Sequence, residues 1–342
     1  MARTGIIGAG SWACGLAYVL LGNGHEVTMW SAVEKEVEML REYSEQKEKL
    51  PGVILEGRFT VTGDLAEAVR DKDLIVMAVP SLYVRETARK MQPLCRYGQL
   101  IVSVAKGIED ESLMLLSDVI REELPSSRIV VLSGPTHAEE VGKGLPTAIV
   151  AGSASEEDSR YVQDIFMNEV FRVYTSSDIT GIQTGGALKN VVALAAGCAD
   201  GLGYGDNTKA ALITRGMNEI TRLGCAMGGR PETFAGLTGI GDLIVTCASM
   251  HSRNRRAGIL IGRGYSAEDA MKEVSQVVEG VYSARAAYDL SQKYGVEMPI
   301  VNEVYQVLFE GKAPAEAVRN LMMRDKKDEN GGTESGKVND NL

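Results

Sequence analysis

The best candidates for chemistry are basic residues in otherwise uncharged surroundings. Lys189 is the only charged residue between Gly185 and Gly197. A lysine among small apolar residues either extends its ammonium group to the surface or stays desolvated, where its pKa falls from about 10.4 toward the range useful for acid–base work. We favour the desolvated arrangement, which predicts that Lys189 exchanges a proton with a substrate.

Lys106 and the segment Ser133–Glu139 each follow an apolar run that predicts a strand. Ligands of open α/β sheets bind at the carboxyl ends of the strands, although a surface lysine is also common there. The backbone N–H groups and hydroxyls of the second segment can hold an anion or a carbonyl. Thr136 and Glu139 also fit a capping box, and both roles are compatible.

Asp242 lies among apolar neighbours in the glycine-containing segment 239–247, and a basic cluster follows at 251–256. Its carboxylate can accept hydrogen bonds from a catalytic lysine. Arg253, with Ser252 and Asn254, offers the charged and neutral donors that suit a phosphate. A charge run usually marks a solvated helix start, and Arg255 and Arg256 fit that interpretation.

A glycine-rich turn near the N-terminus predicts a dinucleotide site. It follows the apolar run 5–7, precedes a small-residue helix at 14–21, and is followed by a second expected strand at 26–30. Gly8 allows the tight turn, Gly10 lets backbone approach a pyrophosphate, and Ala13 permits close helix–strand packing. At the end of the second strand, neither an acidic residue for a ribose hydroxyl nor a cation for a 2′-phosphate stands clearly in place, and Glu34 and Lys35 fit solvated helix charges.

The elements that must position these residues fall into two groups. Further strands are expected at 74–79, 100–104, 128–132 and 148–151, several of them continuously apolar, which predicts a parallel, doubly wound α/β sheet of the Rossmann type. After about Asp178 helices are expected at 182–199, 208–227, 255–261, 267–273, 281–294, 300–309 and 313–320. We predict a dinucleotide-binding domain over 1–178, a helical substrate-binding and catalytic domain over 179–323, and a disordered polar tail over 324–342.

The composition excludes several classes of protein. A formal charge of −10 over 342 residues argues against nucleic acid as a partner but permits a local basic site for an anionic metabolite. No apolar run approaches about 18 residues and no leader pattern is evident, which predicts a cytoplasmic protein without a membrane span. The five cysteines form no C-x-x-C pair and the three histidines lack helical metal spacing, so neither disulfides nor a metal site are expected.

The order and spacing of these segments resemble bacterial NAD(P)-dependent glycerol-3-phosphate dehydrogenases over roughly residues 4–320. The motifs that carry the resemblance include Gly8-Ala9-Gly10-Ser11-Trp12, Leu50-Pro51-Gly52, Ala105-Lys106-Gly107, Ser133-Gly134-Pro135, Leu188-Lys189-Asn190, Gly239-Ile240-Gly241-Asp242, Ser252-Arg253-Asn254 and Val278-Glu279-Gly280.

The resemblance implies reversible hydride transfer between NAD or NADP and C2 of sn-glycerol 3-phosphate, giving dihydroxyacetone phosphate. Lys189 would be the proton acceptor, with Lys106 and Asp242 orienting the reacting oxygen. The implied substrate-binding residues are Lys106, Gly134, Thr136, Lys189, Asp242, Ser252, Arg253 and Asn254. The implied cofactor-binding residues are Gly8, Gly10, Ser11, Trp12, Ala13, Lys106, Ala138, Arg253, Val277 and Glu279.

The family also implies a homodimer and a role in supplying glycerol 3-phosphate for phospholipid synthesis. It commonly carries an arginine near position 32 or 33 that suits a 2′-phosphate, where this chain has Ala32 and Val33, so the choice of nucleotide stays open. Two alternatives remain: a 3-hydroxyacid dehydrogenase of the same architecture, which would bind a substrate carboxylate, and a non-catalytic dinucleotide sensor.

Overall fold

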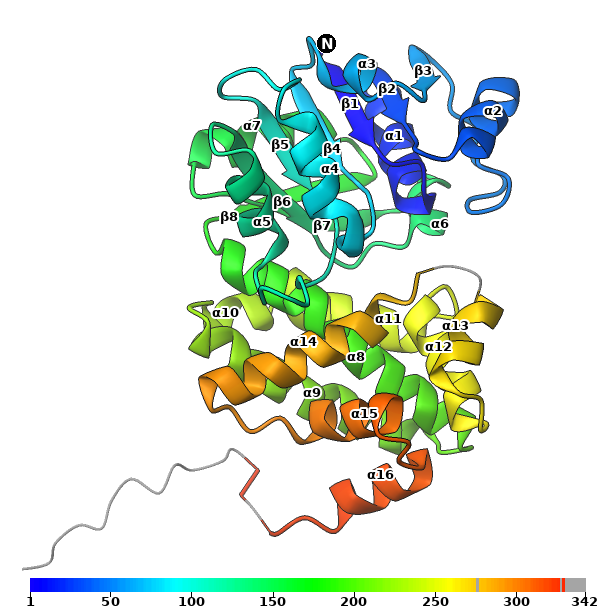
Figure 1. The fold of residues 1–342 in the computed structure, drawn as a ribbon, viewed down its shortest axis with the longest axis vertical. Helices are drawn as coiled ribbons and strands as arrows, with labels where there is room; N and C mark the ends of the chain where they lie inside the picture. The colour runs from blue at the N-terminus through cyan, green and yellow to red at the C-terminus, as the bar shows by residue number, and fades with distance from the viewer. Residues whose placement is uncertain (275–276, 327, 330–342) are drawn as a thin grey trace, which may run out of the picture.

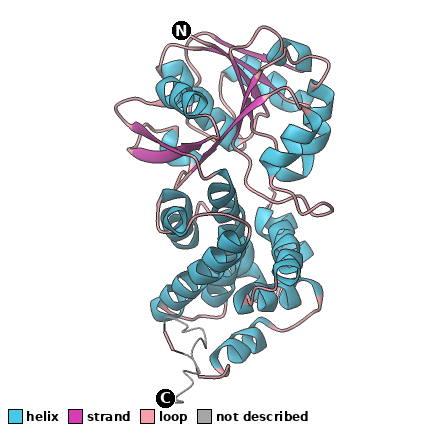
Figure 2. Ribbon diagram, turned by 90° about the vertical axis from the view of Figure 1, so that its left-hand side faces the viewer, coloured by secondary structure: helices cyan, strands magenta, loops and turns pink. Residues whose placement is uncertain are grey.

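The computed structural model describes residues 1–274, 277–326, 328 and 329. A sheet with helices around it forms the N-terminal part, and a group of packed helices forms the other part (Figure 1). All the drawn strands lie at the N-terminal end (Figure 2). The strands are β1 (Arg3–Ile7), β2 (Glu26–Trp30), β3 (Phe59–Thr62), β4 (Leu74–Met77), β5 (Leu100–Ser103), β6 (Arg128–Ser133), β7 (Thr147–Gly152) and β8 (Phe171–Ser176).

The described strands form one eight-stranded sheet in the order β3-β2-β1-β4-β5-β6-β7-β8. The pairing is parallel except between β6 and β7, which are antiparallel. The predicted parallel, doubly wound sheet is confirmed, and this pair is its one exception among the described strands. The connection from β6 to β7 holds only the one-turn helix α6 (Ala138–Val141), so the chain turns back at the carboxyl end of β6 rather than crossing over the sheet.

Helices cover both faces of the sheet, as a doubly wound fold requires. The remaining helices of this part are α1 (Ser11–Gly22), α2 (Glu34–Tyr43), α3 (Leu65–Val69), α4 (Val84–Met91), α5 (Leu116–Glu123) and α7 (Glu156–Phe166), with a 3₁₀ turn at Ser81–Tyr83. Ile6 of β1 packs into a core with α1 and α7, whereas the next residue, Ile7, packs into a second core with α4 and α5. This alternation explains why the central strands are apolar throughout.

Strands β3 and β8 were missing from the sequence prediction. Both lie at edges of the sheet. Their residues alternate between buried and more exposed positions more than those of the central strands do, so neither is a continuous apolar run. In β8 this period of two was present in the sequence and was the signal that could have identified it.

From Ile179 onward the described chain is helical. The helices are α8 (Ile179–Gly201), α9 (Asp206–Ala226), α10 (Pro231–Phe234), α11 (Asp242–Ala248), α12 (Arg253–Gly262), α13 (Ala267–Val274), α14 (Glu279–Tyr294), α15 (Pro299–Phe309) and α16 (Pro314–Met322), with a π-helical turn at Leu237–Gly241. The seven predicted helices are present with slightly different ends. Segment 239–247, expected as a polar glycine-containing stretch, is instead the π turn followed by α11.

Helix α8 is the axis of this second part. Its N-terminus is capped by Asp178, whose carboxylate accepts a hydrogen bond from the Gly181 N–H at 2.9 Å. Glycines bring α8 and α12 into backbone contact: a Cβ at Gly197 would lie 2.2 Å from the Arg255 carbonyl oxygen, and one at Gly258 would lie 2.2 Å from the Leu194 carbonyl oxygen. This close crossing fixes the start of α12 beside the middle of α8.

Within the described residues, no single helix is long and apolar enough to cross a membrane; the bent pair Pro231–Ala248 with Arg253–Gly262 passes such a test by length and composition alone. Most of the tail predicted from residue 324 lies outside the described residues.

Candidate active site

Three charged groups from distant parts of the chain meet at the carboxyl end of the sheet. Lys189, from the middle of α8, donates a hydrogen bond to Asp242 Oδ1 at the start of α11. Lys106, which follows β5, donates to the other carboxylate oxygen of Asp242 at 2.8 Å and to the Gly134 carbonyl oxygen at 3.1 Å. The exposed fractions of the three side chains are 7% for Lys189, 1% for Asp242 and 18% for Lys106.

Burial and mutual charge set the protonation of this cluster. Burial and the neighbouring Lys106 lower the pKa of Lys189, Asp242 opposes both, and the net result is a pKa of about 7. Burial alone would raise the pKa of Asp242, but the charges and hydrogen bonds of the two lysines outweigh it and hold that pKa below its usual value. At neutral pH the carboxylate is ionised and Lys189 is close to its titration midpoint.

Thr246 completes the cluster and was missed by the sequence prediction. Its hydroxyl accepts a hydrogen bond from Lys189 Nζ at 2.8 Å and donates to the backbone carbonyl of Asp242 at 2.6 Å. Thr246 lies one helical turn after Asp242, so the i, i+4 spacing would have shown it only if 242–248 had been predicted as a helix. The threonine directs Lys189 within the site.

Arg253 is partly buried at the first position of α12. Burial lowers its pKa, while Glu279 and Glu139 act in the opposite direction. Among the described residues, none accepts a hydrogen bond from its guanidinium, so its donors lack a protein acceptor there. Such a group beside a helix N-terminus suits a phosphate.

The two neighbours of Arg253 have side chains that are already engaged. Ser252 caps α12, its hydroxyl oxygen accepting from the Arg255 N–H at 3.2 Å. Asn254 donates to Asn190 Oδ1 at 2.9 Å and accepts from the Gly280 N–H at 2.8 Å, which ties α12 to α8 and α14. The structure therefore brings both residues to the site with their side chains in structural roles.

Arg255 corrects the expectation of a solvated helix start. Its guanidinium pairs with Asp200 at 2.7 Å and donates to the Ala248 carbonyl oxygen at 2.8 Å, and only 13% of its side chain is exposed. This pair links the end of α8 with α12 and holds the segment that carries Arg253.

Gly134 and Thr136 lie beside the lysine cluster. The Gly134 carbonyl oxygen accepts hydrogen bonds from Lys106 and, at 3.2 Å, from the Thr136 hydroxyl. The close approach of strand β7 explains the glycine, since a Cβ at Gly134 would lie 3.0 Å from the Ile149 Cα. His137, next in sequence, lies 3.4 Å from the Val245 carbonyl oxygen of α11 and so joins the two parts of the molecule.

The glycine-rich turn has the geometry that a dinucleotide requires. Gly8 adopts a φ of +124°, which L side chains rarely adopt, and a Cβ there would lie 2.8 Å from the Ala78 carbonyl oxygen. At Gly10, the N-cap of α1, a Cβ would meet nothing within 4 Å. No side chain caps this helix N-terminus, so its free N–H groups at Ser11, Trp12 and Ala13 fit a pyrophosphate.

Among the other predicted cofactor residues, Ala138 lies beside α1 next to this turn and Glu279 contacts the segment after β4. Ala138 is buried beside Gly15, whose Cβ would lie 3.6 Å from both the Ala138 Cα and the Trp12 ring. Glu279 begins α14 and accepts a hydrogen bond from the Ser81 N–H at 3.2 Å, joining that helix to the loop after β4. Val277 is partly buried and lies two residues before Glu279.

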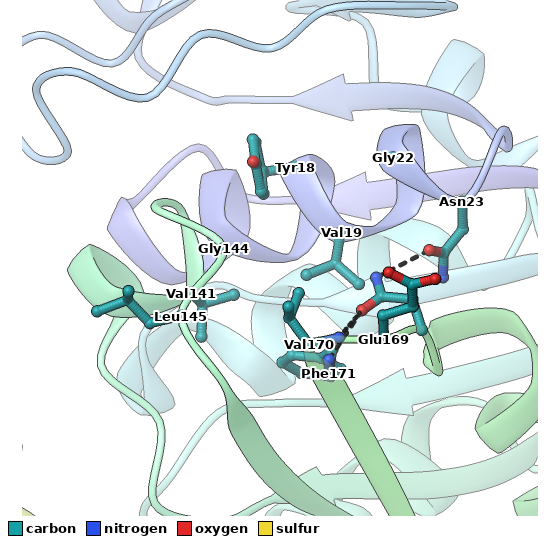
Figure 3. Close-up of a pocket in the computed structure, with 11 residues that line it drawn as sticks. Tyr18, Val19, Gly22, Asn23, Val141, Gly144, Leu145, Glu169, Val170 and Phe171 are labelled. Carbon is teal, nitrogen blue, oxygen red and sulfur yellow. Dashed lines mark hydrogen bonds between the residues drawn. The ribbon is translucent and has the colours of Figure 1, made fainter.

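A separate cavity of about 300 Å³ lies away from these residues, between the C-terminal end of α1, the loop after α6 and the start of β8 (Figure 3). Its amide groups satisfy one another: Asn168 donates to Asn23 Oδ1 at 2.9 Å, and Asn23 donates to the Ile165 carbonyl oxygen at 2.9 Å. With no free cation in its lining, it does not match an anionic substrate. The part of the chain that the structure describes contains no cluster of three or more metal-binding side chains.

Comparison with known proteins gives a consistent result across the whole chain. The family model for the NAD-dependent glycerol-3-phosphate dehydrogenase N-terminus matches residues 3–159, and that for the C-terminus of the same family matches 178–319. A curated Agathobacter rectalis protein, named an NAD(P)+ glycerol-3-phosphate dehydrogenase, is 58% identical over 334 residues, covering 98% of this chain and 99% of its own. The Fusobacterium nucleatum protein of that name is 55% identical, with 96% and 98% coverage.

A solved structure agrees. The crystal structure of glycerol-3-phosphate dehydrogenase from Coxiella burnetii superposes with a TM-score of 0.92 at 35% identity, covering 94% of this chain and 99% of that one. This chain therefore belongs to the NAD-dependent glycerol-3-phosphate dehydrogenase family.

Proposed function

We propose that this protein interconverts sn-glycerol 3-phosphate and dihydroxyacetone phosphate with NAD or NADP. In the direction of reduction, dihydroxyacetone phosphate, reduced nucleotide and one proton give glycerol 3-phosphate and oxidised nucleotide. The observation that carries the proposal is the Lys189–Asp242–Lys106 cluster at the sheet edge that also bears the open dinucleotide turn. The bound nicotinamide supplies or accepts the hydride at C2.

Lys189 is proposed as the proton-transfer residue. Its pKa of about 7 makes both the ammonium and the free amine available near neutrality. In oxidation the free amine accepts the proton of the C2 hydroxyl, and in reduction the ammonium donates it to the C2 oxygen. Thr246 and Asp242 hold the nitrogen in place through their hydrogen bonds.

Lys106 and Asp242 are proposed to prepare the site for charge that develops on the C2 oxygen. The fixed ammonium of Lys106 stabilises negative charge on that oxygen without reorganising, because Asp242 and the Gly134 carbonyl already hold it. The negative charge of Asp242 also offsets the repulsion between the two neighbouring lysine side chains inside the protein. This chemistry requires no metal ion, because the lysines supply both the proton and the positive charge.

Arg253 is proposed to bind the substrate phosphate. Its donors lack a protein acceptor among the described residues, and the free N–H groups of the α12 N-terminus lie in the same segment. The substrate is proposed to lie among Gly134, Thr136, Ser252 and Asn254. The side chains of Ser252 and Asn254 also hold α12 in position through their hydrogen bonds. Binding at the phosphate orients C2 toward Lys189.

The proposed cofactor contacts are Gly8, Gly10, Ser11, Trp12, Ala13, Lys106, Ala138, Arg253, Val277 and Glu279. The open N-terminus of α1 supports the first five, and the contact of Ala138 with the start of α1 supports its inclusion. The two alternatives are set aside. A hydroxyacid dehydrogenase does not require a phosphate-binding arginine, and a non-catalytic sensor does not require the Lys189–Asp242 pair.

Further proposals concern the cellular setting. We propose that the enzyme supplies glycerol 3-phosphate for phospholipid synthesis, as a cytoplasmic homodimer, with a dinucleotide-binding domain over 1–178 and a catalytic domain over 179–323. All five cysteines stand as free thiols, which suits a reducing compartment. Light scattering on the purified protein tests the dimer.

Initial rates test the proposed reaction. Purified protein is assayed with dihydroxyacetone phosphate and, separately, with 3-oxo acids such as acetoacetate, using NADH and NADPH side by side. Turnover of the phosphorylated ketone alone supports the proposal. Turnover of the acid alone, or tight dinucleotide binding with no turnover of either compound, contradicts it.

A further inference from the structure

The segment that follows β2 contains a closed hydrogen-bond network. Ser31, immediately after the last residue of β2, is buried and donates to Glu36 Oε2 at 2.6 Å. The Val33 N–H donates to Ser31 Oγ at 3.1 Å. Glu36 is also buried, with 11% of its side chain exposed, and its other carboxylate oxygen pairs with Lys49.

This network lies where a dinucleotide-binding sheet reads the adenosine ribose. In such folds the end of the second strand faces the 2′ position, which carries a hydroxyl in NAD and a phosphate in NADP. Gln46, from the segment between α2 and Lys49, donates a hydrogen bond to the carbonyl oxygen of Ala9 in the glycine-rich turn at 3.2 Å. The network is therefore beside the expected nucleotide site.

The two possible groups at the 2′ position need opposite partners. A hydroxyl both donates and accepts hydrogen bonds, whereas a phosphate only accepts and carries a charge of about −1.5 to −2 at pH 7. A site for the phosphate must offer unpaired donors or cations. A site for the hydroxyl works with neutral groups and acceptors.

The cations and hydroxyl of this segment are already committed. Lys49 is paired with Glu36, Lys35 is paired with Glu48, and the Ser31 hydroxyl hydrogen is directed at Glu36. Glu34 and Glu36 place two carboxylates in the first turn of α2. Lys35, Lys49 and the Ser31 hydroxyl are thus each directed at a carboxylate.

We propose that Glu36 is a specificity-determining residue that makes this enzyme prefer NAD(H) to NADP(H). By taking up the ammonium of Lys49 and the hydroxyl hydrogen of Ser31, it removes the donors that a 2′-phosphate needs and adds a negative charge beside that position. The inference rests on the proposed function only in requiring that the chain bind a dinucleotide.

Direct binding tests the preference without turnover. The dissociation constants of NADH and NADPH are measured for the full chain by isothermal titration calorimetry at fixed ionic strength. We expect NADH to bind at least about tenfold more tightly than NADPH. Equal affinity, or tighter binding of NADPH, overturns this inference and leaves the proposed function intact; failure to bind either nucleotide overturns both.

Two variants test the cause. Glu36→Gln keeps the shape of the side chain while releasing Lys49 and one negative charge, so the NADPH to NADH ratio of dissociation constants should fall about tenfold. Val33→Arg adds a guanidinium at a position that is 51% exposed, leaves the network in place, and should tighten NADPH binding by a similar factor. An unchanged ratio in folded Glu36→Gln, or unchanged NADPH affinity in Val33→Arg, overturns the assignment.

Glu86→Gln is the matched control. It removes the same charge from an exposed position on α4, where Glu86 pairs only with Lys90 one turn away. The ratio of dissociation constants should equal that of the wild type. A shift in this variant as large as that in Glu36→Gln overturns the inference, because the preference would then follow net charge rather than the network.

Discussion

Lys189 and Asp242 form a buried ion pair that joins the middle of α8 to the first residue of α11. The amine is desolvated, yet it keeps a carboxylate partner, and Lys106 approaches that same carboxylate from the sheet. Opposing effects therefore bring the pKa of Lys189 to about 7, far below that of a solvated lysine. The proton-transfer role depends on this balance.

The balance predicts the pH dependence of the reaction. Oxidation needs the free amine of Lys189, so kcat/KM for glycerol 3-phosphate should rise with pH through about 7 and level off above it. Reduction needs the ammonium, so kcat should fall over the same range. Rates measured between pH 5.5 and 9 at constant ionic strength check both limbs. A flat profile in both directions would show that the titration of Lys189 does not control the reaction.

Removal of the free guanidinium should selectively weaken recognition of the phosphate. We expect Arg253→Ala to lower kcat/KM for dihydroxyacetone phosphate by about 10²-fold, since a charge-assisted bidentate contact is lost. The rate with unphosphorylated dihydroxyacetone should change little, so the comparison of the two ketones isolates the phosphate contact. Arg263→Ala, at the exposed end of α12, serves as the control. Equal losses on both ketones would argue for a general structural role of Arg253.

Gly10 separates folding from nucleotide binding. Its φ of −76° and ψ of 177° are open to alanine, and a Cβ there meets nothing within 4 Å of protein. The free energy of unfolding of Gly10→Ala should therefore lie within about 0.5 kcal/mol of the wild-type value. The variant should nevertheless bind NADH at least about tenfold more weakly. Gly22→Ala, at the other end of α1 and equally free of contacts, should change neither. Undiminished NADH binding in Gly10→Ala would place the pyrophosphate elsewhere.

The buried Glu219, outside the proposed active site, should make the stability of the protein depend on pH. Its buried carboxylate accepts hydrogen bonds from the Ile300 N–H at 2.8 Å and the Val301 N–H at 3.2 Å, and burial raises its pKa to about 7. The folded state then holds a proton that the unfolded state releases, so this group lowers stability as pH rises from about 4.5 to about 7. The free energy of unfolding of Glu219→Gln, relative to the wild type, should increase between pH 5 and pH 8.

The expected increase in the relative free energy of unfolding of Glu219→Gln is of the order of 3 kcal/mol, which is the energy equivalent of the pKa shift of Glu219. Urea unfolding at the two pH values measures it. Glu310→Gln, which changes an exposed carboxylate, should show no such difference. A pH-independent difference for Glu219→Gln would show that the carboxylate is ionised in the folded protein throughout this range.

Continuous apolar strands and long helices were predictable because burial on both faces, or on one helical face, leaves a strong pattern. Edge strand β3 and the antiparallel direction of β7 were not, because they depend on neighbours and on the path of a connection. Strand β8 was missed although its alternation was present in the sequence. The π turn and α11 were not predicted because the glycines at 239 and 241 are unfavourable in helices. Tertiary packing decided that segment: a Cβ at Gly185 of α8 would lie 2.6 Å from the Thr238 carbonyl oxygen of the π turn.

For the site, residue type was enough to identify a lysine that could not be solvated and an acid that needed a partner. The sequence could not show that the Asp242 carboxylate accepts hydrogen bonds from both lysines. Nor could it show that the Asn254 side chain is hydrogen-bonded to Asn190 and Gly280. Those facts depend on which helices cross. The network around Glu36 was also hidden, since its partner Lys49 comes from beyond the helix that carries it.

Replacement of Lys189 tests the central claim most directly. Lys189→Met keeps the length of the side chain and removes the amine, so the variant should fold and bind NADH as the wild type does. Its initial rate of dihydroxyacetone phosphate reduction should fall by about 10²- to 10⁴-fold, the usual range for loss of an acid–base group. A rate within a few fold of the wild type, with NADH binding retained, would contradict the assignment of Lys189 as the proton-transfer residue.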